Sequence, residues 1–144
     1  MKLRLALIFC FLLILGGCKE RLKTGDTYIT VNDTIYAAAS NSIYEYHKGI
    51  SSDSTRLYPK DFKTLPIQII HFTNQDNIQV IFNEEPLNSP SYILYKDGAV
   101  EPYYRGGTFI PPTEKGYYYL CVECAWGTEE KYYGYQYYFY FSKE

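Results

Sequence analysis

The chain of 144 residues has few of the side chains from which metal and redox sites are built. It contains two histidines and four cysteines, and two of the cysteines lie within the first 18 residues. A tetrahedral zinc site needs four ligands, mostly Cys and His. The other two cysteines, Cys121 and Cys124, are three residues apart in a run that favours a strand, so their thiols should point to opposite faces. We therefore expect no metal, redox site or other cofactor, with Cys124 in the core and Cys121 at the surface.

Basic charge is scarce as well. Lys and Arg together number 14 against 16 Asp and Glu, for a formal net charge of −2. Nucleic-acid-binding domains present a basic patch or stripe, and none is visible here, so nucleic acid is not an expected partner. Gly106-Gly107 lacks the later glycine and the lysine of a phosphate-binding loop.

No residue pattern typical of an active site stands out. Nucleophilic catalysis needs a nucleophile, a base and an orienting group that converge, and His47 and His71 lie in separate segments without such a pattern. The acidic pairs Glu84-Glu85 and Glu129-Glu130 lie beside turns, where solvated charges are expected rather than the paired carboxylates of a glycosidase. We therefore expect a protein that is not an enzyme.

The apolar run near the N-terminus is too short to cross a bilayer as a helix. Leu5–Leu15 has 11 residues, whereas a spanning helix needs about 20. Lys2 and Arg4 precede the run and two glycines close it. This order of positive, apolar and small residues is that of an export signal. Residues 1–17 are therefore predicted to be a signal peptide, which leaves 12 basic against 16 acidic residues in the mature chain.

The end of this run, Leu15-Gly16-Gly17-Cys18, resembles the bacterial lipobox. The resemblance implies cleavage before Cys18, a diacylglyceryl thioether on its sulfur and a further acyl chain such as palmitate. Two or more acyl chains give stable membrane attachment. Residues 18–26 are then the lipidated cysteine and a tether. The expected location is the extracytoplasmic side of the bacterial cell membrane, or the outer membrane where there are two. The alternatives are a secreted protein with a chance cysteine and an N-terminal transmembrane anchor.

The composition of the mature chain indicates an all-β fold. Tyrosine occurs 18 times, with 13 of these between Tyr92 and Tyr140, and aromatic and β-branched residues favour strands. The polar stretch Gly49–Arg56 reads as a loop, and Asp97-Gly98 as a tight turn. Short apolar segments bordered by prolines predict a sandwich or barrel. The expected strands are Tyr28–Val31, Thr34–Ala38, Ile43–His47, Ile67–Phe72, Ile78–Phe82, Tyr92–Tyr95, Ala99–Tyr104, Thr108–Ile110, Tyr117–Trp126 and Tyr135–Phe141.

Alternation along the last two strands predicts which residues form the core. One face of the first holds Tyr118, Leu120, Val122, Cys124 and Trp126, and one face of the second holds Tyr137, Phe139 and Phe141. The run Glu114-Lys115-Gly116-Tyr117-Tyr118 is similar to the turn before strand F of immunoglobulin-like domains. That similarity implies that the Tyr118 hydroxyl bonds back to the backbone.

From about Tyr28 to Phe141 the chain resembles a family of uncharacterised small lipoproteins of Bacillus-like Firmicutes. The resemblance is carried by Ile78–Phe82 with Glu85-Pro86, by Thr108–Gly116, and by an aromatic strand ending at Trp126. It implies a single immunoglobulin-like β-sandwich over residues 27–144 and no particular activity. Many members carry a Cys-Trp pair early in the domain, and this chain has Tyr44-Glu45-Tyr46-His47 there instead.

The opposite faces of the last two strands supply a candidate binding surface. Alternation places Tyr117, Tyr119, Tyr138 and Tyr140 on one side of two adjacent strands, and exposed aromatic clusters mark interaction sites. The alternative is that another element covers these rings or that they stack across the strand pair. We expect a membrane-anchored, non-catalytic binding module whose partner is a protein or an envelope polymer. A purely structural envelope component is the second hypothesis, and an exported enzyme is the third.

Overall fold

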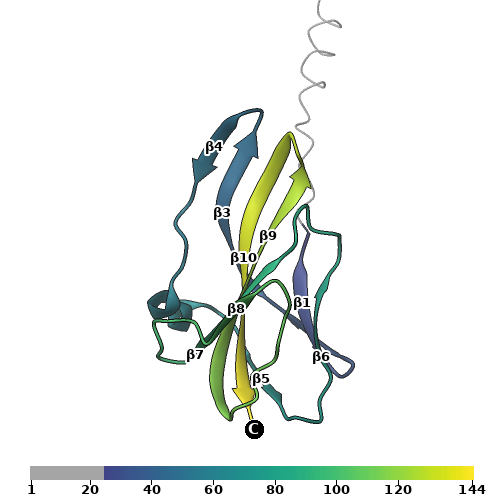
Figure 1. Cartoon of the computed structure of the whole chain (residues 1–144), viewed down its shortest axis with the longest axis vertical. Helices are drawn as coiled ribbons and strands as arrows, with labels where there is room; N and C mark the ends of the chain where they lie inside the picture. The colour runs from purple at the N-terminus through teal and green to yellow at the C-terminus, as the bar shows by residue number, and fades with distance from the viewer. Residues whose placement is uncertain (1–24) are drawn as a thin grey trace, which may run out of the picture.

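The computed structural model describes residues 25–144, which form two β-sheets packed face to face with one short 3-10 helix (Figure 1). The all-β, two-sheet expectation is confirmed. The strands and the 3-10 helix η1 run in the order β1 Thr27–Val31, β2 Thr34–Ala37, β3 Ala39–His47, β4 Ile50–Asp53, η1 Pro59–Thr64, β5 Ile69–Phe72, β6 Ile78–Phe82, β7 Ser91–Lys96, β8 Tyr104–Gly106, β9 Gly116–Thr128 and β10 Lys131–Lys143.

The larger sheet is organised around the β9–β10 hairpin. Its strands follow the order β4-β3-β10-β9-β7-β8, and β5 adds a parallel pairing to the C-terminal part of β10. β9 and β10 pair along their full 13-residue lengths. The smaller sheet, β2-β1-β6, is antiparallel throughout.

The main core lies between the two sheets and confirms the predicted inner face. Tyr118, Leu120, Val122, Cys124 and Trp126 of β9 are all buried there, and Phe139 and Phe141 of β10 lie beside them. Each fully buried large apolar side chain contributes on the order of 1.5–3 kcal/mol relative to exposure. The Tyr118 hydroxyl donates to the backbone oxygen of Glu114 at 3.0 Å, as expected from the sequence.

A second core covers the outer face of the larger sheet. Phe62 of η1 is buried against Ile93, Tyr119, Cys121 and Tyr138. The prediction that Cys121 lies at the surface was therefore wrong, although Cys121 and Cys124 do lie on opposite faces. The reason is that the segment before β5 folds back over the sheet. Leu57, Leu65 and Ile67 of this segment join the same cluster.

Three strand predictions need correction. The stretch predicted as a loop contains β4, which pairs with β3 through a turn in which both Lys48 and Gly49 have positive φ, as in a two-residue hairpin turn. The segment predicted as a strand over Ala99–Tyr104 has its strand residues at Tyr104–Gly106 instead, and Thr108–Ile110 forms none. Proline lacks the backbone N–H that a ladder needs, and Pro102, Pro111 and Pro112 lie within or beside these segments.

The predicted signal peptide, Cys18 and most of the tether lie outside the described residues. The described part begins at Gly25, which is buried against the ring of Trp126. None of the elements formed by residues 25–144 is a helix with the length and apolarity required to cross a bilayer.

Candidate functional site

The four tyrosines of the expected binding surface do not form an open surface. Tyr117 is 48 % exposed, but Tyr119 is 6 % exposed and Tyr138 is fully buried. The expectation of four exposed rings was therefore wrong for Tyr119 and Tyr138, because Phe62 lies over both, with ring centroids 5.2 and 5.1 Å away. Tyr140 is partly buried between Tyr117 and Tyr119, with centroids 5.9 and 4.3 Å apart. Tyr119, Tyr138 and Tyr140 are therefore packed, as the alternative expected, whereas Tyr117 stays exposed.

A groove beside this cover is the more open candidate. Three adjoining hollows of about 210, 410 and 150 Å³ all have Arg56 in their lining. We call them together the Arg56 groove. Its walls come from β3, from the segment between β4 and η1, from β9 and from the loop before β7. The side chains used below are Tyr44, Arg56, Tyr58, Asn88, Ser89, Arg105 and Glu123.

Arg56 is held in the groove by an ion pair with Glu123. The Arg56 side chain remains 45 % exposed and lines all three hollows, so it is accessible to a ligand. Partial burial is the largest single influence and lowers the pKa of Arg56, but the hydrogen bond to Glu123 and the charge of that carboxylate, with smaller contributions, together outweigh it and raise the pKa. The guanidinium is thus a fixed, permanently charged donor.

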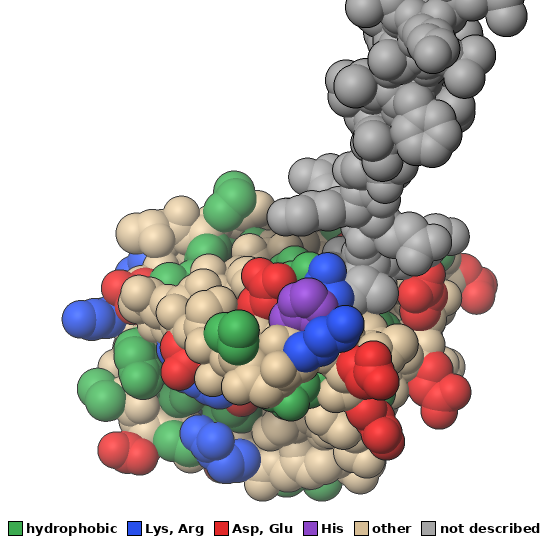
Figure 2. All heavy atoms as spheres, turned by 90° about the horizontal axis from the view of Figure 1, so that it is seen from above, with side chains coloured by type: hydrophobic (Ala, Val, Ile, Leu, Met, Phe, Trp, Pro, Cys, Tyr) green, Lys and Arg blue, Asp and Glu red, His purple; other side chains and the backbone are tan. Residues whose placement is uncertain are grey.

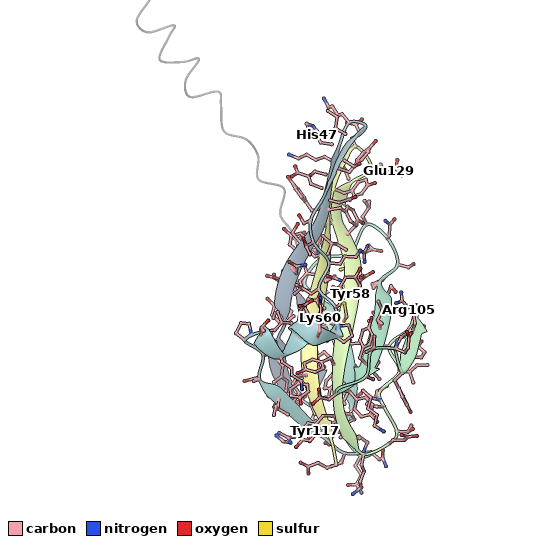
Figure 3. The ribbon with its side chains drawn as sticks, turned by 90° about the vertical axis from the view of Figure 1, so that its left-hand side faces the viewer. His47, Tyr58, Lys60, Arg105, Tyr117 and Glu129 are labelled. Atoms are coloured by element: carbon pink, nitrogen blue, oxygen red, sulfur yellow. The ribbon has the colours of Figure 1, made fainter. Side chains whose placement is uncertain are left out.

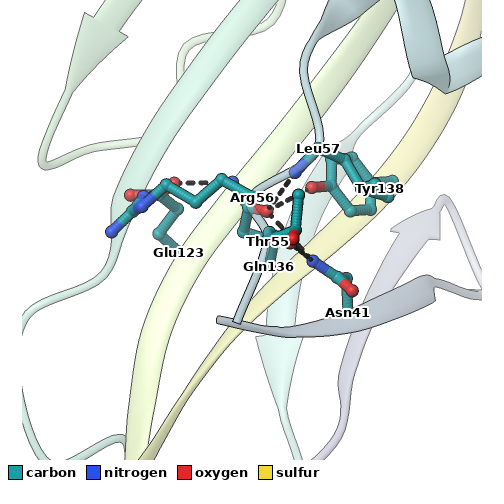
Figure 4. A network of polar contacts seen from close by, with 7 residues as sticks. All are labelled: Asn41, Thr55, Arg56, Leu57, Glu123, Gln136 and Tyr138. Atoms are coloured by element: carbon teal, nitrogen blue, oxygen red, sulfur yellow. Dashed lines mark hydrogen bonds and ion pairs between the residues drawn. The ribbon is translucent and has the colours of Figure 1, made fainter. Parts of the chain in front are cut away.

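A buried amide fixes the floor of the groove (Figure 4). Gln136 is 4 % exposed, and its Nε2 donates to Glu123 at 2.8 Å. Its Oε1 accepts from the Tyr138 hydroxyl at 2.5 Å and from the backbone N–H of Leu57 at 3.2 Å. Asn41 adds a bond from its Nδ2 to the backbone oxygen of Thr55 at 3.0 Å. The residues on either side of Arg56 are therefore tied to β3 and β10.

Aromatic rings and further polar groups border the groove. Tyr58 comes from the segment just before η1 and Arg105 from β8, and both line the same hollow (Figure 3). Tyr44 is partly buried, and burial together with the nearby Tyr132 hydroxyl raises its pKa, so it stays a neutral donor. The loop before β7 adds Asn88 and Ser89 at one end.

Among residues 25–144, neither cysteine is paired with a histidine. Burial, chiefly, raises the pKa of the Cys121 thiol, so it remains protonated, and the thiolate is the reactive form. His71 pairs with Glu144 at 3.1 Å, far along the chain from His47 on β3. Within residues 25–144 no cluster of His, Cys, Asp and Glu has the geometry to hold a metal ion. The arrangement of the groove suits binding by hydrogen bonds and aromatic contact.

The Arg56 groove was not predicted from the sequence. One signal was available: Glu123 and Gln136 are polar residues in the middle of two aromatic strands, and they are directly paired across the hairpin. A polar pair on a face otherwise made of aromatic residues indicates that these side chains have hydrogen-bond partners there. No sequence pattern indicated that Arg56 lines the groove, because its position depends on how the segment between β4 and η1 folds over the sheet.

Comparisons of the chain with protein-family models, with curated proteins and with solved structures gave no match.

Proposed function

We propose that this protein is a bacterial lipoprotein, attached through Cys18 on the extracytoplasmic side of the membrane, that binds a polymer strand of the cell envelope in the Arg56 groove without turning it over. The observation that carries the binding proposal is the groove itself. Three joined hollows share one oriented, charged donor whose position is fixed by a buried hydrogen-bond network.

The lining of the groove favours a hydroxyl-rich, near-neutral polymer. Arg56 is already paired with Glu123, so the centre of the groove carries no large net charge and offers both donors and acceptors. Tyr44 and Tyr58 supply ring faces beside these groups. Polar groups that fix orientation beside apolar ring surfaces are the usual composition of small-molecule and polymer sites.

Attachment through Cys18 is supported by the sequence of the first 18 residues, which combines a positive start, an 11-residue apolar run and a lipobox-like end. The finer fold assignment, an immunoglobulin-like sandwich, is part of the same proposal. It is supported by the two packed sheets and by the Tyr118 hydroxyl bonded to Glu114, which corresponds to a tyrosine corner.

The binding proposal is tested with the full-length lipoprotein in detergent micelles, by co-sedimentation with purified envelope polysaccharide. Arg56→Ala should weaken binding by about tenfold or more, since a hydrogen bond to a charged group contributes about 1.5–3 kcal/mol. Lys60→Ala is the matched control, because Lys60 is an exposed cation on η1 that does not line the groove. Equal binding by the Arg56 and Lys60 variants would exclude the groove as the site.

The second candidate is a purely structural envelope component. It is favoured by the packing of Tyr119 and Tyr138, which shows that the tyrosine-rich strands serve the core. Failure of the wild-type protein to bind any envelope polymer, with the fold intact, would favour this alternative.

A further inference from the structure

The first described residue is fixed to one end of the sandwich. The Tyr137 hydroxyl donates to the backbone oxygen of Gly25 at 2.7 Å, and Trp126 Nε1 donates to the same hydroxyl at 2.7 Å. A Cβ added at Gly25 would overlap the Trp126 ring. The chain therefore enters the domain at the level of Trp126, whatever path it takes before Gly25.

Covalent geometry limits how far this entry point can be from a lipid on Cys18. Seven residue steps separate Cys18 from Gly25, and a fully extended chain covers at most about 3.3–3.6 Å per residue. Gly25 must then lie within about 25 Å of the acylated cysteine. The end of the domain that carries Trp126 is held toward the bilayer.

Two hairpin turns lie beyond Trp126 at this same end. Trp126 pairs with Tyr133, and β9 continues only two residues further, to Thr128. At about 3.4 Å per residue, the β9–β10 turn projects roughly 7 Å past the entry point. The β3–β4 turn is level with it, because His47 pairs with Lys131 and the backbone N–H of Lys48 donates to Glu130 at 2.9 Å. We call these joined turns, residues 47–50 and 128–131, the hairpin tips.

The chemistry of the hairpin tips suits the headgroup region of a bilayer. Ile50 is 76 % exposed at the outermost turn, beside Lys48. The rings of Tyr46 and Tyr132 stack behind it with centroids 4.8 Å apart. An apolar side chain next to lysine and tyrosine is the pattern of membrane-interface segments. Seen end-on, side chains of both charges surround a histidine and lie beside hydrophobic ones (Figure 2).

We propose that the hairpin tips are the membrane-facing surface of this protein, with Ile50 in contact with the lipid headgroups. This inference rests on the proposed attachment through Cys18. The tips carry Lys48 and Lys131 against Glu129 and Glu130, so anionic lipid is not needed for the contact. Instead, the short tether promotes the contact between tips and lipid, because it keeps the hairpin tips at a high effective concentration near the membrane surface.

The test uses the full-length lipidated protein in phosphatidylcholine vesicles, with a fluorophore on one introduced cysteine. Ile50→Cys places the label at the tips. Val100→Cys is the matched control, because Val100 is also aliphatic, is 80 % exposed and follows β7, whose last residue pairs with Tyr118 at the opposite end of β9. Cys121 and Cys124 are buried and should not react in the folded protein.

Lipid-borne quenchers should reduce emission from position 50 at least twofold and leave position 100 unchanged. Insertion of ten Gly-Ser residues after Lys19 should restore the emission from position 50. Co-flotation of the protein with vesicles but equal quenching at both positions would overturn the orientation alone. Absence of co-flotation would overturn the attachment through Cys18 and the orientation together.

Discussion

Glu123 and Gln136 face each other across the β9–β10 hairpin, and the Gln136 amide donates to the Glu123 carboxylate at 2.8 Å. They are polar residues on an outer face that is otherwise filled by Tyr119, Cys121 and Tyr138. Through Gln136 the pair holds the backbone of Leu57, and through Glu123 it holds Arg56. One hydrogen bond thus joins the second core to the groove.

Gln136→Ala should destabilise the domain by about 1–3 kcal/mol, because it leaves the Tyr138 hydroxyl and the Leu57 N–H without their buried partner. Urea denaturation measures the change. Ser52→Ala, at an exposed position on β4, is the control and should be near neutral. Equal stability of the Gln136 variant and wild type would show that the network does not hold the cover in place.

Phe62→Ala should remove the centre of the second core at a cost of about 3–5 kcal/mol. It should also expose Cys121, whose ring neighbours Tyr119 and Tyr138 lose their cover. A thiol reagent applied without denaturant should label this variant much faster than wild type. Lys63→Ala, an exposed change on the same helix, should do neither. Slow labelling of the Phe62 variant would mean that another group shields Cys121.

Stability should fall at alkaline pH. Burial, chiefly, raises the pKa of the Cys124 thiol from 9.0 to about 12, and it also raises the pKa values of Cys121, Tyr137 and Tyr138. The unfolded chain loses these protons first, so the contribution to stability is complete below about pH 9 and is lost as pH rises toward 12. Urea titrations at successive pH values should show a flat region and then a steep decline. Cys124→Ala should make the decline shallower; an unchanged slope would contradict this assignment.

Tyr118→Phe tests the corner at the start of β9. Loss of the hydroxyl that bonds to Glu114 should cost about 0.5–1.5 kcal/mol in thermal or urea unfolding. Tyr117→Phe provides the comparison on the neighbouring residue, which is exposed, and should change stability by less. The corner has no stabilising role if the two variants are indistinguishable.

Cys18→Ser tests membrane attachment. Without the thiol no thioether can form, so a full-length precursor should accumulate and take up no labelled fatty acid. Cys10→Ser, within the apolar run, should still be processed and labelled. Cleavage and labelling of the Cys18 variant would place the anchor elsewhere.

The inner face of the larger sheet was predictable because alternation in β9 and β10 is strict, and every residue assigned to it from Tyr118 to Trp126 is buried. The burial of the outer face was not predictable, because the same alternation occurs whether that face contacts solvent or a covering segment. Phe62 lies 57 residues before Tyr119 and 76 before Tyr138, the rings it covers, and no local sequence pattern predicts such a contact. The Arg56 groove depends on the position of the same covering segment. Only the Glu123–Gln136 pair at its floor could therefore have been recognised from the sequence.

The position of β10 at the end of the chain determines when the domain can fold. β10 is the last strand in the chain, yet it pairs with β3, β5 and β9 and supplies residues to both cores. Neither core can close before residues 131–143 are available, and pairings this distant in sequence form slowly. A chain emerging N-terminus first therefore cannot complete either core until its final segment has followed. For a chain exported as proposed above, this would preserve the threadable state that passage through a narrow translocation channel requires. The strand order thus delays completion of the fold until the whole chain is available.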